Sequence, residues 1–187
     1  MNTQDKKVQK VLETIEKEKI ENNNPCWIIT RDTGEFLNKL IRDNNFKRVL
    51  EIGTSIGYSG IWMAEALSQT GGKLYTVESH NGRFKTAEQN ISNAGLTAYV
   101  QQLKGHAPDV PIPDMFDILF LDATKVEYVS YIKAFLFHMK KGGIIIADNA
   151  LTHEKELSAY KEYIFNSPQL ESKLLKIGNG LFYSIIK

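Results

Sequence analysis

The chain has 187 residues, which suits one domain with a sizeable hydrophobic core. Its 23 basic and 22 acidic side chains leave a formal net charge of +1, so the overall charge gives no attraction toward nucleic acid or anionic membranes. The single cysteine, Cys26, excludes an intrachain disulfide and a cysteine-rich zinc site. The N-terminus is polar and no apolar run approaches the length of a membrane span, so we expect a cytoplasmic protein.

Hydrophobic periodicity predicts two N-terminal helices and then an alternation of strands and helices. The first helix is expected over residues 5–20, and the second begins near Asp32, whose spacing to Glu35 resembles a capping box. Strands are expected at 48–52, 73–78, 98–103, 116–122 and 143–148, and further helices at 58–69, 82–94, 126–140 and 154–165. Two last strands, 170–177 and 181–186, are joined around Gly178-Asn179-Gly180, which is typical of a hairpin turn.

This order of elements predicts an α/β fold with a Rossmann-like, doubly wound sheet. We expect seven strands, mostly parallel, with an antiparallel C-terminal hairpin. The chain should form one domain over 1–187, with N-terminal helices in 1–45 and the Rossmann-like core in 46–187. In such sheets, ligands bind beyond the carboxyl ends of the strands, where the strand order reverses.

A glycine loop, Gly53-Thr54-Ser55-Ile56-Gly57, follows the first strand of this core, which ends around Glu51. Gly53 has no Cβ, so the backbone there can approach a ligand closely, and Gly57 lets the next helix pack near the strand. The E-x-G-x-x-x-G spacing differs from the G-x-G-x-x-G of nicotinamide and flavin sites, and the loop lacks the lysine of a P-loop.

The second strand of the core ends in an acid, Glu78, which is placed to accept hydrogen bonds from ribose hydroxyls. A packing loop and a solvated acid are the alternatives when each feature is taken alone. Together, the loop and the acid indicate a ligand that contains adenosine.

Polar side chains also end the fourth and fifth strands of the core. Asp122 ends one of them, and Asp148 and Asn149 end the other. In a doubly wound sheet these strands are neighbours about 4.8 Å apart, so the three side chains should converge beside the glycine loop. Three oxygen ligands suit a hard cation such as Mg²⁺. The alternatives are an Asx turn for Asp148 and Asn149 and a capping acid for Asp122.

Lys125 follows Asp122 closely, and Thr124 and Glu127 could form a capping box that places it in a first helical turn. The helix dipole disfavours a cation there, and beside a divalent cation the same field would lower the pKa of the lysine, as a general base near neutral pH requires. A lysine that points into water is the alternative.

With these motifs in place, the chain from about Ile29 to its C-terminus resembles the metal-dependent O-methyltransferases, the group of catechol and caffeoyl-CoA O-methyltransferases. The matching stretches are Leu50–Ser59, Tyr75–Glu78, Phe116–Ala123 with Lys125 and Tyr128, Gly142–Asn149, and Gly180-Leu181.

The resemblance implies the class I methyltransferase fold, S-adenosylmethionine as cofactor, a divalent cation such as Mg²⁺, and a homodimer. It implies that Lys125 is the catalytic base and that Asp122, Asp148 and Asn149 hold the metal. The cofactor site that it implies consists of Ile29, Glu51, Gly53, Ser55, Gly57, Tyr58, Ser59, Glu78, Ser79, Ala107 and Asp122. Within this set, Ile29 is expected near the methyl group and Ala107 near the adenine.

Two features of this chain depart from the family pattern. The stretch between Asn149 and Gly180 is short, and Lys173, with Glu171 nearby, falls roughly where catechol enzymes carry a carboxylate for the second hydroxyl. Small residues, Ala123 and Thr124, follow Asp122. We therefore expect an acceptor site that is wide or is completed by a partner subunit.

The expected reaction is a direct in-line transfer of a methyl group to a hydroxyl of a small, catechol-like or phenolic acceptor. An enzyme that modifies hydroxylated uridine in tRNA is an alternative, against which the near-zero net charge counts. Two others are a cofactor-binding protein without catalysis and a nicotinamide oxidoreductase, the latter disfavoured by the spacing of the loop.

Overall fold

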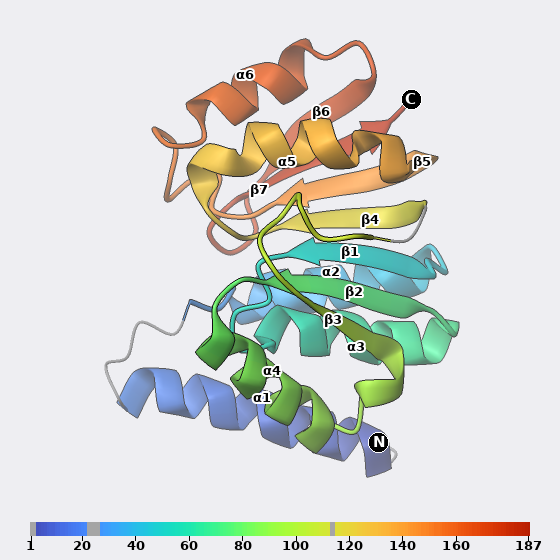
Figure 1. The fold of residues 1–187 in the computed structure, drawn as a ribbon, viewed down its shortest axis with the longest axis vertical. Helices are drawn as coiled ribbons and strands as arrows, with labels where there is room; N and C mark the ends of the chain where they lie inside the picture. Colours follow the sequence, from blue (N-terminus) through green and yellow to red (C-terminus); the bar gives the residue numbers. More distant parts are fainter. Residues whose placement is uncertain (1–2, 22–26, 113–114) are drawn as a thin grey trace.

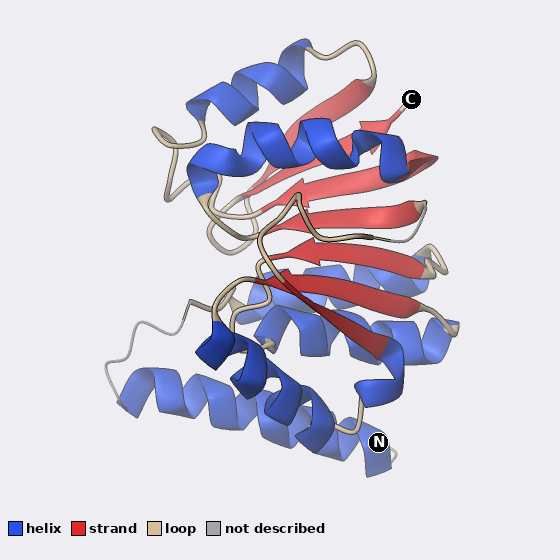
Figure 2. Ribbon diagram, viewed as in Figure 1, coloured by secondary structure: helices blue, strands red, loops and turns tan. Residues whose placement is uncertain are grey.

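The computed structural model describes residues 3–21, 27–112 and 115–187. One sheet crosses the middle of the molecule, with helices on both faces (Figures 1 and 2). Its strand order is β3-β2-β1-β4-β5-β7-β6, so the order reverses between β1 and β4. The strands are β1 (Arg48–Ile52), β2 (Lys73–Glu78), β3 (Val100–Lys104), β4 (Phe116–Leu121), β5 (Met139–Ala147), β6 (Leu170–Leu175) and β7 (Leu181–Ile186).

The helices divide between the two faces of the sheet. They are α1 (Thr3–Glu21), α2 (Arg31–Asp43), α3 (Tyr58–Thr70), α4 (Asn81–Asn93), α5 (Tyr128–Phe135) and α6 (Ser158–Asn166), with the 3₁₀ turns η1 (Thr97–Tyr99), η2 (Lys125–Glu127) and η3 (Leu136–His138). Helices α1 to α4 pack on one core cluster, and α5 and α6 pack on a second. Alternation along the strands explains the division, since Ile118 and Phe120 join the first cluster while Leu119 and Leu121 join the second. None of the helices in the described part of the chain is long and apolar enough to cross a membrane.

The fold expected from the sequence is confirmed. The strands β1 to β5 are parallel, and β7 pairs antiparallel with both β5 and β6.

Some element boundaries differ from the prediction. The helix expected over 126–140 is confined to α5 and its two flanking 3₁₀ turns, because Met139 pairs with Phe116 and already belongs to β5. The last helix begins at Ser158 rather than near residue 154. Helix α2 is capped by Thr30, whose side chain accepts a hydrogen bond from the Thr33 amide, so the capping role expected of Asp32 is wrong.

Candidate active site

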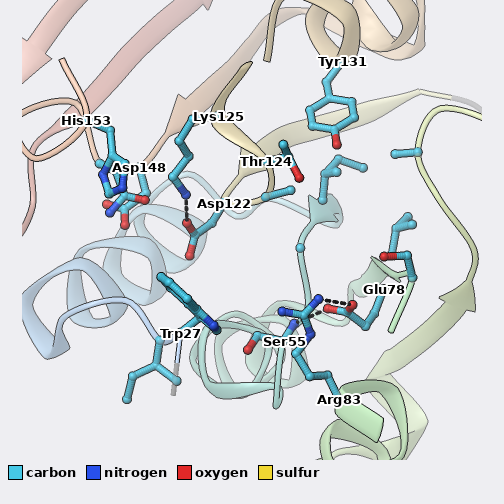
Figure 3. Close-up of a pocket in the computed structure, with 18 of the residues that line it drawn as sticks. Trp27, Ser55, Glu78, Arg83, Asp122, Thr124, Lys125, Tyr131, Asp148 and His153 are labelled. Carbon is cyan, nitrogen blue, oxygen red and sulfur yellow. Dashed lines mark hydrogen bonds and ion pairs between the residues drawn. The ribbon is translucent and has the colours of Figure 1, made fainter. Parts of the chain in front are cut away.

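A cavity of about 620 Å³ opens beyond the carboxyl ends of the parallel strands (Figure 3). Every parallel strand contributes to it through the loop that follows the strand. The segment before α2 and the turn between β6 and β7 complete the wall. The lining residues include Trp27, Ile28, Gly53, Ser55, Glu78, Ser79, Arg83, His106, Ala107, Asp122–Lys125, Tyr131, Asp148, Asn149, Thr152, His153 and Asn179.

The glycine loop is held against the ends of β2 and β4. The amides of Gly53 and Thr54 donate to the Val77 carbonyl at 3.0 and 3.1 Å. Gly53 has φ +105°, and a Cβ on it would lie 2.2 Å from the Asp122 carbonyl oxygen. A glycine is therefore required here, and the close contact brings the loop and the end of β4 together on one wall of the cavity.

Glu78 lies at the opposite end of the cavity from Lys125 (Figure 3). Its side chain is only 5% exposed and accepts hydrogen bonds from the amides of Ser55 at 2.8 Å and His80 at 2.7 Å. Arg83 of α4 pairs with it at 3.2 Å. The Ser55 hydroxyl is buried and has no hydrogen-bond partner among the described residues, so it is available to a ligand.

Glu51 lies beneath the loop and does not line the cavity. It is fully buried and accepts hydrogen bonds from the hydroxyls of Thr76, at 2.6 Å, and of Ser59. Burial raises the pKa of Glu51 to about 7, against the opposing effect of these two hydrogen bonds. The acid fixes the start of α3 to β2 and so supports the floor of the site.

Asp122 and Asp148 lie side by side because Leu121 and Ala147, the residues before them, are paired in the parallel register of β4 and β5. Lys125 donates to Asp122 at 2.8 Å. Asp148 is 1% exposed, and its Oδ1 atom has no hydrogen-bond partner in the described part of the chain. Burial, followed by the negative charge of Asp122, raises the pKa of Asp148 to about 7.

The two neighbouring acids, Asp122 and Asp148, are suited to bind a cation. Within the described ranges, no three His, Cys, Asp or Glu side chains gather as a metal site, but the predicted set contains two acids and the amide of Asn149. The Asp148 Oδ1 atom has no partner among the described residues, and burial and the Asp122 charge raise the pKa of the Asp148 carboxyl, so a cation placed beside the two acids would stabilise them. Oxygen ligands of this kind suit Mg²⁺.

Besides Glu51, four residues of the expected cofactor set lie behind the cavity wall and do not line it. Ile29 is buried next to Ile28, which does line the cavity. The Tyr58 hydroxyl bonds to Glu16 of α1, and Ser59 bonds to Glu51. A Cβ on Gly57 would lie 3.2 Å from the Ala87 side chain, so this glycine lets the start of α3 approach α4 rather than the strand.

Several lining residues were not anticipated from the sequence. Arg83 lies five positions after Glu78, in the first turn of α4, and that spacing could have suggested it. Trp27, His106, Thr152, His153 and Asn179 lie on connecting segments, where no periodic pattern marks a residue.

The structure corrects one expectation about Lys125 and shows where Lys173 lies. Lys125 begins the 3₁₀ turn η2, and the Thr124 side chain makes no capping hydrogen bond, so the predicted capping box is wrong. Lys173 lies on the edge strand β6, 4.9 Å from the centre of the Tyr183 ring, and does not line the cavity.

Two solved structures similar to this chain are O-methyltransferases. An O-methyltransferase from Bacillus cereus, in complex with SAH, has a TM-score of 0.85 and 27% identity, covering 95% of this chain and 91% of that one. The O-methyltransferase TomG from Streptomyces achromogenes, in complex with SAM, has a TM-score of 0.81 and 25% identity, covering 95% of this chain and 89% of that one. The fold is thus that of the class I methyltransferases.

The family follows from sequence comparison. An O-methyltransferase family model matches residues 2–184. A catechol O-methyltransferase from Niastella koreensis is 37% identical over 140 residues, which span 71% of this chain and 62% of that protein. A caffeoyl-CoA O-methyltransferase from Populus trichocarpa is 27% identical over 178 residues, or 80% of this chain and 71% of that protein. The chain belongs to the O-methyltransferase family, which confirms the resemblance seen in its motifs.

Proposed function

We propose that the protein transfers the methyl group of S-adenosylmethionine to a hydroxyl of a small, catechol-like or phenolic acceptor. One observation carries this proposal: a single cavity joins the Gly53–Ser55 loop and Glu78 to the cluster of Asp122, Lys125 and Asp148. The first group suits an adenosine, and the second suits an oxygen that must lose a proton. The catechol and caffeoyl-CoA enzymes among its relatives support this class of acceptor.

The cofactor is bound along the glycine loop. Glu78 accepts hydrogen bonds from the ribose hydroxyls, and the free Ser55 hydroxyl bonds to the polar end of the cofactor. Ser79 and Ala107 line the adenosine side of the cavity. Glu51, Gly57, Tyr58 and Ser59 act indirectly, because they hold the loop and the start of α3 in place.

Lys125 acts as the general base that accepts the proton of the acceptor hydroxyl. The resulting oxygen anion attacks the methyl carbon of the sulfonium, a carbon–oxygen bond forms, and the carbon–sulfur bond breaks. The products are the methyl ether, the neutral thioether cofactor and a lysine ammonium. Opposite charges are neutralised in the transfer, so a closed cavity that positions both reactants favours it.

We further propose that Asp122, Asp148 and Asn149 hold a divalent cation, with Mg²⁺ the first candidate. When bound, the cation stabilises the deprotonated acceptor oxygen as a Lewis acid. Treatment with EDTA should abolish methyl transfer and added Mg²⁺ should restore it, while Asp148→Asn should weaken Mg²⁺ binding measured by calorimetry. Full activity of a chelator-treated, metal-free preparation would contradict this role.

The activity is tested with S-adenosylmethionine labelled in its methyl group. The label should pass to vicinal-diol aromatics and not to unmodified or hydroxyuridine-containing tRNA. Label found in nucleosides of digested tRNA, with none in the aromatic acceptors, would favour the tRNA-modifying alternative. Tight binding of the cofactor without transfer to any acceptor would favour a binding protein without catalysis.

The other parts of the proposal concern the whole protein. We propose a homodimer, which the family resemblance implies and light scattering would test. One methyltransferase domain over 1–187 and a cytoplasmic location stay predictions.

A further inference from the structure

The wall of the cavity that follows β5 is fixed by the turn before β7. The amides of Ala150 and Leu151 donate to the carbonyls of Gly180 and Asn179, both at 2.9 Å. Gly180 has φ +84°, and a Cβ on it would lie 2.5 Å from Leu151 Cγ. The short stretch after Asn149 is therefore pressed against this turn, and its next side chains line the cavity.

His153 is held in this wall at both ends of its backbone. Its amide donates to the Asn149 carbonyl at 3.0 Å, and its carbonyl accepts from the Leu157 amide at 3.0 Å. The side chain is fixed as well, because Nδ1 lies 3.0 Å from the Thr152 hydroxyl. The other ring nitrogen, Nε2, has no hydrogen-bond partner among the residues that the structure describes, and the ring lines the cavity.

His153, Asp148 and Lys125 lie at the same end of the cavity, away from Glu78 (Figure 3). His153 is not part of a cluster of three acids or histidines that could bind a metal, at least within the described ranges. Because Nε2 makes no hydrogen bond to the described residues and the ring lines the cavity, this nitrogen is available to an acceptor bound at this end. Glu171 and Lys173 both belong to β6 and neither lines the cavity, so neither contacts an acceptor bound there.

We propose that His153 Nε2 forms a hydrogen bond with a second oxygen of the acceptor, adjacent to the hydroxyl that is methylated. His153 thereby selects rings with two neighbouring oxygens over monophenols. A site built to bond an oxygen discriminates strongly against the analogue that lacks it, because its own polar group is then left unpaired. This inference rests on the proposed function and specifies its acceptor.

Two substitutions of His153 distinguish the role of Nε2 from that of Nδ1. His153→Asn keeps a polar atom near the position of Nδ1 and loses Nε2, whereas His153→Gln places an amide nitrogen near the position of Nε2. The acceptors are catechol and phenol, with phenol measured as a competitive inhibitor where it is not methylated. We expect His153→Asn to lower kcat/KM for catechol about ten- to a hundredfold, His153→Gln to restore part of it, and binding of phenol to change by less than about threefold.

Controls distinguish this role from a structural one. His138→Asn changes a histidine of η3 outside the cavity and should leave catechol kinetics unchanged. The shift in Tm caused by S-adenosylmethionine should be the same in wild type and His153→Asn. Equal losses for catechol and phenol, or no loss for catechol, would overturn the role of His153 alone. A wild-type protein that methylates no ortho-dihydroxy ring would overturn the proposed function as well.

Discussion

At the scale of single residues, substitution of Lys125 tests whether this lysine is the general base of the proposed reaction. Its Nζ atom bonds to Asp122 at 2.8 Å and lies 5.6 Å from the centre of the Tyr128 ring, so it is well positioned without the acceptor. Lys125→Met should lower kcat by about 10²- to 10⁴-fold, the usual contribution of a positioned general base. Cofactor binding, measured by calorimetry, should stay within about threefold because Lys125 lies away from Glu78.

The matched control for this prediction is Lys141→Met, which removes an exposed lysine of β5 that does not line the cavity. It should keep full activity. If Lys125→Met retains wild-type kcat at every pH, the base is another group or the transfer needs none.

Glu51 makes the stability of the protein depend on pH. Its pKa is raised from the ordinary 4.5 to about 7, so the folded state holds its proton more tightly than the unfolded chain does. The contribution of Glu51 to stability is therefore present below about pH 4.5 and is lost as the pH rises to about 7. The loss amounts to roughly 3 kcal/mol across this window.

Glu51→Gln removes that dependence, since the amide does not ionise. We expect the variant to gain stability relative to wild type between pH 5 and pH 8, as measured by urea unfolding at each pH. Asp148 has a raised pKa as well, but it is common to both proteins and cancels in the comparison. A difference between the two proteins that does not vary with pH would show that Glu51 ionises normally in the fold.

At the scale of elements, α1 is an integral part of the structure. Its apolar stripe of Val8, Leu12 and Ile15 is buried, and Leu12 is fully so. Leu12→Ala should lower the free energy of unfolding by about 2–5 kcal/mol, because it leaves a cavity under the helix. Ile20→Ala, on the same helix but with Ile20 81% exposed, should change it by less than about 0.5 kcal/mol. Similar effects of both changes in urea unfolding would mean that α1 does not dock in solution.

The elements also show how far the sequence could predict the structure. Strands β1, β2 and β7 have the predicted bounds, because short apolar runs between turn residues mark buried strands clearly. The end of α5 could not be located, since Leu136 and Met139 keep helical spacing although Met139 pairs with Phe116 across the sheet. Pairing with a distant strand overrides a local pattern in such a case.

In the site as well, how well a residue could be predicted depends on whether neighbouring strands or contacts between loops position it. Asp122 and Asp148 could be placed side by side from the sequence, because both end parallel strands whose neighbour relation follows from the doubly wound order. The position of His153 depends on contacts between its segment and the Gly178–Gly180 turn, which only the folded chain brings together. The pair of acids at the acceptor end was therefore predictable, and the wall of that end formed after β5 was not.

At the scale of the whole molecule, binding of the cofactor should be visible as stabilisation of the entire fold. The cavity is lined by the loops after all five parallel strands, so a ligand in it couples both halves of the sheet. A ligand that binds only the folded state, at 100 times its Kd, adds about 2.7 kcal/mol to stability. For a chain of this length, that corresponds to a rise in Tm of roughly 5–10 °C.

S-adenosylmethionine should produce this shift, and NAD at the same concentration should not, because the loop around Gly53 has the wrong spacing for a nicotinamide dinucleotide. Glu78→Ala should abolish most of the shift, since it removes the acceptor for the ribose hydroxyls, whereas Glu171→Ala on the exposed edge of β6 should leave it intact. A larger shift with NAD would instead place the protein among nicotinamide-binding enzymes, and a shift that survives Glu78→Ala would mean that the adenosine lies elsewhere in the cavity.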